Sequence, residues 1–184
     1  PPGAQQRAID DAFADLCTNR PMNRLIQGDV GSGKTLVAAA CGWLAAKNGL
    51  QCALMAPTEL LAEQHHRTLC GLLAPFGVKI VLLTGSLTAA NKRKLKEALA
   101  TGQIDLCIGT HALLTEDVQW QNLALVITDE QHRFGVGQRV TLREKGTATH
   151  MMIMSATPIP RTLSLMIYGD LDVSVIDQLP PGRT

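Results

Sequence analysis

The chain has 184 residues, of which 46% are hydrophobic, and it carries a formal net charge of +1 with a pI near 8.1. This length and composition exclude a disordered chain and predict one globular domain with a sizeable core. The nearly balanced charge argues against binding a polyanion through bulk charge, so any polyanion site must be local.

Cysteine usage and hydropathy predict a cytoplasmic protein with no membrane association. The five cysteines include no C-x-x-C pair and lie within or beside apolar runs, which favours buried, reduced thiols over disulfides or metal ligands. No stretch reaches the roughly 18 apolar residues of a membrane span, and the N-terminus has no signal pattern. Both ends have turn or linker composition. We therefore expect a piece of a longer chain, with the domain at 1–178 and the start of a linker at 179–184.

Apolar periodicity predicts helices that alternate with short, continuously apolar strands. Such alternation is typical of an α/β fold, a doubly wound and mostly parallel sheet with helices on both faces. Ligands of these sheets bind beyond the carboxyl ends of the strands. The helices are expected at 5–16, 36–47, 59–73 (with Thr58 as N-cap) and 89–100, and the strands at 24–27, 52–56, 78–83, 104–109, 123–128 and 151–154.

Residues 28–35 read Gly-Asp-Val-Gly-Ser-Gly-Lys-Thr, which has the phosphate-loop spacing G-x-x-x-x-G-K-[ST]. Such a loop surrounds a polyphosphate with backbone N–H groups at a helix N-terminus, where side chains would obstruct the approach. Lys34 is expected to reach the β- and γ-phosphates, and the Thr35 hydroxyl to hold Mg²⁺. The predicted nucleotide contacts of the loop are Gly28, Gly31, Ser32, Gly33, Lys34 and Thr35.

A glutamine, Gln5, lies at the start of the first predicted helix, upstream of the phosphate loop. Its amide can read an adenine edge by donating one hydrogen bond and accepting another. The alternative is an ordinary exposed glutamine.

Two acids, Asp129 and Glu130, follow the apolar strand predicted at 123–128. Beside a phosphate loop, the first can hold Mg²⁺ and the second can orient or deprotonate the attacking water. The alternative is a pair of solvated loop acids. His132 follows them and is expected to form hydrogen bonds, because no second histidine or cysteine lies at zinc-ligand spacing.

Ser155 and Thr157 end the next predicted strand, where they could bond to the acids and relay nucleotide state. Simple turn capping is the alternative for both hydroxyls. His65 and His66 lie on a predicted helix and are expected to be surface or partly packed residues.

The densest basic run is Lys92, Arg93, Lys94 and Lys96, on a helix that also carries Glu97. A solvated helix face and a phosphate contact are both open for it. An aromatic content of 3% argues against a platform for base stacking.

Six segments, in order and at similar spacing, resemble the motifs of superfamily 2 helicases. Gln5 is placed like that family's adenine-reading glutamine. The segments are 28–35 (motif I), 57–60 (motif Ia), 84–85 (motif Ib), 109–111 (motif Ic), 129–132 (motif II) and 155–157 (motif III).

The runs 28–35, 55–65, 129–136 and 157–162 resemble the bacterial RecG-type ATP-dependent DNA helicases, which remodel stalled replication forks and branched junctions. The transcription-repair coupling translocases share most of these runs, but they typically have a second glutamate where this chain has Gln131. That position favours the RecG type.

The resemblance implies the first RecA-like motor domain of a DNA helicase of recombination and repair, using ATP and Mg²⁺. Its partners would be branched or forked DNA, a second RecA-like domain and an N-terminal wedge domain of the same protein. Lys34, Asp129 and Glu130 would be catalytic; Thr35 and Asp129 would hold the metal; His132, Ser155 and Thr157 would couple ATP to motion; Thr58, Thr84, Gly85 and Thr110 would contact the DNA backbone.

Other readings remain open at this point. One is the motor domain of a transcription-repair coupling type translocase on double-stranded DNA, and another is a nucleotide-binding regulatory module without motor activity. A GTPase or small kinase is disfavoured, because the sequence has no N-K-x-D guanine signature and no arginine-rich lid segment.

Overall fold

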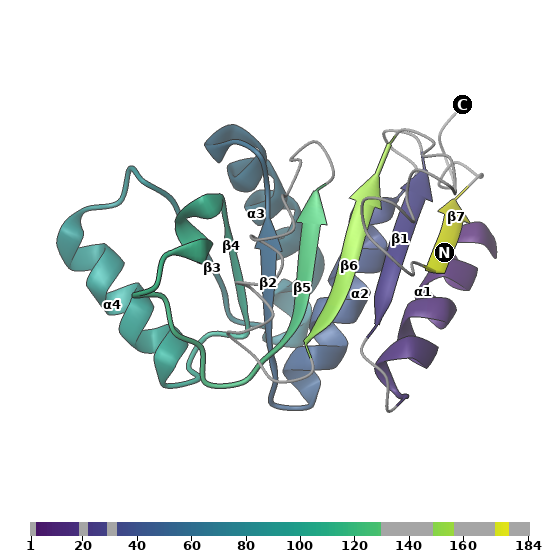
Figure 1. The fold of residues 1–184 in the computed structure, drawn as a ribbon, viewed down its shortest axis with the longest axis horizontal. Coiled ribbons are helices and arrows are strands. Elements are labelled where there is room, and N and C mark those ends of the chain that lie inside the picture. The colour runs from purple at the N-terminus through teal and green to yellow at the C-terminus, as the bar shows by residue number, and fades with distance from the viewer. Residues whose placement is uncertain (1–2, 19–21, 29–32, 130–148, 157–171, 177–184) are drawn as a thin grey trace.

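Seven parallel strands form one sheet in the order β3-β4-β2-β5-β6-β1-β7 (Figure 1). The computed structural model describes residues 3–18, 22–28, 33–129, 149–156 and 172–176. The strands are β1 (Asn23–Gly28), β2 (Gln51–Met55), β3 (Ile80–Leu83), β4 (Leu106–Gly109), β5 (Leu123–Asp129), β6 (His150–Ser155) and β7 (Asp172–Ile176).

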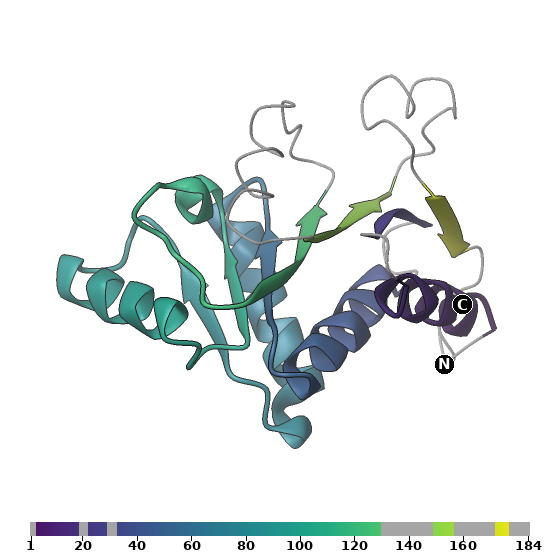
Figure 2. The ribbon, with the colours of Figure 1, turned by 60° about the horizontal axis from the view of Figure 1, so that its bottom comes forward.

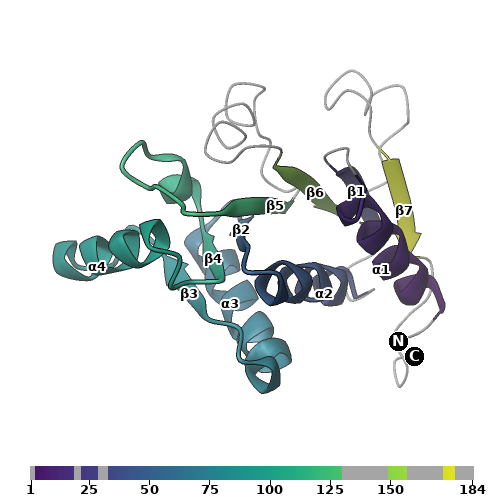
Figure 3. The same ribbon diagram turned by 90° about the horizontal axis from the view of Figure 1, so that it is seen from below.

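The helices cover both faces of the sheet, which confirms the predicted doubly wound α/β fold. One face carries α1 (Gly3–Leu16), α2 (Lys34–Lys47) and α3 (Glu59–Leu73), and the other carries α4 (Ala89–Ala100) (Figure 3). In Figure 2, α4 lies beyond the β3 side of the sheet, apart from α1 and α2. Two short 3₁₀ helices, η1 (Ala74–Phe76) and η2 (His111–Leu114), complete the described elements.

The helices that begin after a capping side chain, α3 and α4, start at the predicted residues. Thr58 is the N-cap of α3, and its hydroxyl accepts a hydrogen bond from the Leu61 N–H at 3.2 Å. Thr88 caps α4 in the same way through the Asn91 N–H, also at 3.2 Å. Each cap satisfies a backbone donor that the first helical turn cannot pair, so the helix begins at a definite residue.

Two interior strands of the sheet, β2 and β4, are buried along their whole length. Every residue of β2 and of β4 is buried, which explains why both are apolar in sequence apart from Gln51 at the start of β2. The sheet therefore separates two cores, one beneath α1, α2 and α3 and one beneath α4 and η2. The carboxyl ends of the strands are left at one common edge.

Strand β7, which pairs with β1 at the edge of the sheet, was not predicted. Only two of its five residues are buried, so its apolar pattern is weak. Arg24 of β1 connects β7 to α1: its Nη1 donates to Ser174 Oγ at 2.9 Å, and its Nε donates to Asp15 Oδ2 at 2.6 Å. The predicted linker at 179–184 lies outside the described residues.

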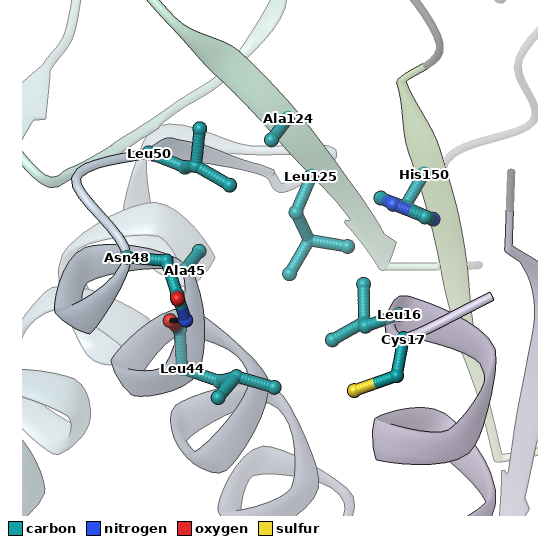
Figure 4. A pocket seen from close by; sticks show the side chains of 9 residues that line it. All are labelled: Leu16, Cys17, Leu44, Ala45, Asn48, Leu50, Ala124, Leu125 and His150. Carbon is teal, nitrogen blue, oxygen red and sulfur yellow. Dashed lines mark hydrogen bonds between the residues drawn. The ribbon is translucent and has the colours of Figure 1, made fainter. Parts of the chain in front are cut away.

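A cavity of about 260 Å³ lies at the amino ends of β5 and β6, beside the last turns of α1 and α2 (Figure 4). His150 is one of its few polar side chains; its Nδ1 accepts a hydrogen bond from the Met22 N–H at 2.7 Å, and burial lowers its pKa. Ligands of parallel sheets bind at the opposite edge, so this cavity is not the candidate nucleotide site. Among the described residues, no helix is long and apolar enough to span a membrane.

Candidate nucleotide-binding site

The phosphate loop joins the carboxyl end of β1 to the amino end of α2. Gly28 is the last residue of β1, and Gly33 is the N-cap of α2 with φ +96°, in the left-handed region that favours glycine. The Gly33 carbonyl accepts hydrogen bonds from the N–H groups of Leu36 and Val37, at 3.0 and 3.4 Å. Residues 29–32, which include the predicted contacts Gly31 and Ser32, lie outside the described residues.

Gln5 lies beside this loop. Its side chain extends from α1 and the residue is only 1% exposed. A Cβ atom added at Gly33 would be 2.0 Å from Gln5 Nε2, so the two residues are in direct contact. The structure thus brings the predicted adenine-reading glutamine to the loop, whereas its recognition of adenine stays a prediction.

Lys34 reaches back across the loop. Its Nζ donates a hydrogen bond to the Gly28 carbonyl at 2.5 Å, so the ammonium group lies where the loop begins. Thr35, the predicted metal-holding hydroxyl, follows in the first turn of α2 and is partly buried. Both side chains therefore lie at the amino end of α2, where the helix dipole favours an anion.

Asp129 ends β5 and Ser155 ends β6, and these strands lie on one side of β1 in the order β5-β6-β1. Asp129 is in register with Met154, and Ser155 is in register with Gln27, one residue before Gly28. The predicted acid and the predicted coupling serine thus share the edge of the sheet with the phosphate loop. Ser155 is fully buried. Glu130, His132 and Thr157 lie outside the described residues.

His65 on α3 belongs to this site, which sequence reasoning missed. Its Nε2 lies 3.1 Å from Asp129 Oδ2, and the two side chains are 15% and 16% exposed. The expectation of a partly packed histidine was correct, but its partner is 64 residues away in sequence. The one available signal was the inclusion of His65 in the helicase-like run 55–65, which gives no contact.

The predicted DNA contacts gather at the carboxyl ends of the neighbouring strands β3, β4 and β2. Thr84 and Gly85 follow β3, Thr110 follows β4, and Thr58 follows β2 at the start of α3. Thr84 and Thr110 are only 2% and 8% exposed, and the Thr84 hydroxyl lies 2.9 Å from Ser86 Oγ. The structure therefore brings these four residues to one edge, although it buries two of their side chains.

The N–H of Gly85, one of the predicted DNA contacts, donates to Glu59 Oε1 at 2.8 Å. Glu59 is the first residue of α3 and is exposed. A carboxylate oxygen thus occupies the acceptor position at this N–H.

Gly109 has a packing role. A Cβ there would lie 2.5 Å from the backbone carbonyl oxygen of Leu83, so a side chain would push β3 and β4 apart. Packing alone, without any ligand, therefore favours glycine at position 109.

The basic run on α4 is partly neutralised. Lys96 forms an ion pair with Asp117, and the hydrogen bond from Lys96 is the main cause that lowers the pKa of Asp117 to about 2. Arg93 and Lys94 are exposed. A solvated face and a phosphate contact both remain compatible with those two cations.

A phosphate loop at the end of a parallel strand, with an acid at the end of the next strand but one, defines the class: a RecA-like P-loop nucleotide-binding domain. The sequence model of the DEAD/DEAH box helicases matches residues 3–166, and the chain belongs to this family.

Curated relatives named ATP-dependent DNA helicase RecG match the whole chain. The chain is 54% identical over 182 residues to the protein of Aquifex aeolicus (strain VF5), covering 98% of this chain and 23% of that protein. It is 53% identical over 188 residues to the protein of Escherichia coli (strain K12), covering 100% of this chain and 27% of that protein. The chain thus spans about a quarter of the length of these relatives.

Solved structures give the same fold. A structure of RecG bound to a three-way DNA junction matches with a TM-score of 0.85 and 46% identity, covering 98% of this chain and 24% of that one. A DNA-bound structure of the helicase MrfA matches with a TM-score of 0.72 at 18% identity, covering 94% and 27%. The second likeness concerns the fold alone.

Proposed function

We propose that this chain is the first RecA-like motor domain of a RecG-type ATP-dependent DNA helicase that remodels branched DNA and stalled forks in recombination and repair. The observation that carries the proposal is the shared edge of the sheet at which Lys34, bonded to the end of β1, lies with Ser155 of β6 and Asp129 of β5. The 53% to 54% identity to proteins named RecG supports the substrate class.

ATP would be held by the loop. Lys34 exchanges its bond to the Gly28 carbonyl for the β- and γ-phosphates, and the backbone of Gly28, Gly31, Ser32 and Gly33 surrounds them. Gln5 would read the adenine from its position against Gly33.

The oxygen donors at the site suit Mg²⁺. The Thr35 hydroxyl and the Asp129 carboxylate are ligands of the kind this ion prefers, and they lie at the sheet edge that carries the loop. When bound, the ion would neutralise charge on the phosphates. Glu130 would orient the attacking water, and His132, Ser155 and Thr157 would link the acids to the rest of the motor.

The DNA backbone would lie along the ends of β2, β3 and β4, beside Thr58, Thr84, Gly85 and Thr110. Contacts of this kind fix position without reading sequence, which suits a motor that steps along any strand. The second RecA-like domain and an N-terminal wedge domain would complete the machine, and we propose a cytoplasmic location in a bacterium.

The test compares the 184-residue chain with a full-length helicase that contains it. An arginine finger from a second domain can contribute about 10³ to 10⁵ in rate, so the isolated chain should bind Mg²⁺-ATP weakly and hydrolyse it poorly. The full-length protein should hydrolyse ATP with stimulation by branched DNA. Robust DNA-stimulated turnover by the isolated chain would contradict the two-domain site. A full-length protein that binds nucleotide but never hydrolyses it would indicate a regulatory module.

A further inference from the structure

We infer that His65 is a positioning residue that fixes the carboxylate of Asp129 for the Mg²⁺-nucleotide complex. This inference rests on the proposed function and extends it to a helix, α3, that carries none of the predicted catalytic residues.

The contact joins two distant parts of the chain. His65 Nε2 lies 3.1 Å from Asp129 Oδ2, within hydrogen-bond distance, and both side chains are at least four-fifths buried, with 15% and 16% exposed. It exists because β2 and β5 are neighbours in the sheet, with Met55 in register with Thr128. The helix that follows β2 therefore passes the end of β5.

The chemistry of the pair sets the direction of the hydrogen bond. An ionised carboxylate can only accept, so His65 must carry its proton on Nε2 and donate to Asp129. A donor fixed to Oδ2 restricts rotation of the carboxylate about its Cβ–Cγ bond. A metal-binding acid is thereby held in one orientation before the nucleotide arrives.

Hydrogen bonds of this kind have a measurable effect in metal sites. Carboxylates that bind a metal are themselves usually hydrogen-bonded, and removing the outer partner typically costs about 10 to 100-fold in metal affinity or activity. We expect a loss in that range when His65 loses its donor.

A purely structural role, attaching α3 to the sheet, is the competing explanation. The helix has other attachments: the buried residues Ala62, Leu69 and Leu73, and the bond from the Gly85 N–H to Glu59. Loss of one polar contact should therefore leave the helix in place.

The next residue provides a matched control. His66 is also partly buried on α3, and its Nε2 lies 3.5 Å from Cys70 Sγ, one turn along the same helix. His66→Ala removes a histidine from the same helix and leaves the contact with Asp129 in place.

The experiment uses a full-length helicase containing this chain and the variants His65→Ala, His65→Gln, His65→Leu and His66→Ala. Binding of a fluorescent ATP analogue is titrated with Mg²⁺ in the absence of turnover, and steady-state hydrolysis on branched DNA is measured separately. His65→Ala and His65→Leu should need about 10 to 100-fold more Mg²⁺ for half-maximal nucleotide binding, with unchanged binding in EDTA. His65→Gln keeps an N–H donor and should recover most of the affinity, and His66→Ala should match the wild type.

The inference is overturned if His65→Leu keeps the wild-type dependence on Mg²⁺, or if His65→Gln is as defective as His65→Leu. Those two variants are similar in size and differ in the donor, so their comparison decides the matter even if His65→Ala fails to fold. Failure of the proposed function is a separate result: the wild-type protein would then show no Mg²⁺-dependent binding of the ATP analogue.

Discussion

Gln5 of α1 contacts Gly33 of the phosphate loop so closely that the loop has no room for a side chain. A Cβ at residue 33 would lie 2.0 Å from Gln5 Nε2 and 2.8 Å from Gln5 Cδ. The same glycine has φ +96°, so its backbone and its surroundings both demand glycine. The predicted adenine reader and the predicted phosphate loop are therefore packed as one unit.

We expect Gly33→Ala to destabilise the fold and to weaken nucleotide binding. The left-handed backbone alone should cost about 1–3 kcal/mol, and the overlap with Gln5 adds to it. Urea unfolding of the 184-residue chain measures the first effect, and titration with a fluorescent ATP analogue measures the second.

The double variant Gln5→Ala/Gly33→Ala separates the two causes. It removes the overlap but keeps the strained backbone. Its loss in free energy of unfolding should therefore be smaller than the sum of the losses in the two single variants. Strict additivity of the two substitutions would show that the contact between residues 5 and 33 carries no energy.

We expect Lys34→Ala in a full-length helicase to abolish ATP hydrolysis and fork remodelling while DNA binding is largely retained. The ammonium group bonded to the Gly28 carbonyl is the cation placed to meet the phosphates, and alanine cannot replace it. Hydrolysis and fork unwinding are measured beside gel-shift binding of branched DNA.

Lys47→Ala is the matched control, because Lys47 lies at the other end of the same helix with its Nζ 5.0 Å from the centre of the Trp43 ring. It should hydrolyse ATP as the wild type does. A Lys34→Ala protein that still unwinds forks would refute the role of the loop.

Much of this fold could be predicted because the strong local signals coincide with the final packing. Buried β4, and β2 after Gln51, are continuously apolar, and Thr58 marks the start of α3. The edge strand β7 was missed because it has only five residues and its apolar residues do not mark its buried face. Val173 and Val175 are exposed, whereas Ser174 between them is buried. The carboxyl ends of the predicted strands lie within one residue of the observed ends, and the sheet order then brought Asp129 to the loop.

The contact between His65 and Asp129 could not be predicted, because it depends on which strands are neighbours. The sequence separates them by 64 residues, and only the adjacency of β2 and β5 brings α3 to the end of β5. The same limit applies to Thr84 and Thr110: their position at strand ends was predictable, but their burial depends on how the neighbouring segments pack over them.

We expect Glu59→Gln to increase DNA affinity modestly, with the largest gain at low salt, where charge repulsion is least screened. Glu59 Oε1 accepts from the Gly85 N–H, so its negative charge lies where the proposed DNA backbone would approach. Neutralising that charge removes a repulsion, whereas the amide oxygen of glutamine can still accept the bond. Fluorescence anisotropy with a labelled fork at several salt concentrations measures the effect.

Glu63→Gln, one turn further along α3, is the control for a change in overall charge. If both variants tighten binding equally, the effect comes from net charge. If Glu59→Gln weakens binding, the carboxylate does not compete with a phosphate at Gly85.

We expect the stability of the chain to fall above about pH 9 through its buried thiols. Burial raises the pKa of Cys41 to about 12, and it also raises the pKa values of Cys52 and Cys107 above the ordinary value of 9.0. The unfolded chain then loses thiol protons at a lower pH than the folded chain, so the free energy of unfolding decreases as pH rises through 9. Each thiol can contribute up to about 1.4 kcal/mol per pH unit until its folded pKa is reached, and below pH 8 the contribution is constant.

Urea unfolding under reducing conditions at pH 8, 9 and 10 measures the slope. Cys41→Ala should make it shallower, whereas Cys17→Ala, at an exposed position, should leave it unchanged. An identical slope in Cys41→Ala and the wild type would mean that Cys41 ionises alike in the folded and unfolded chains.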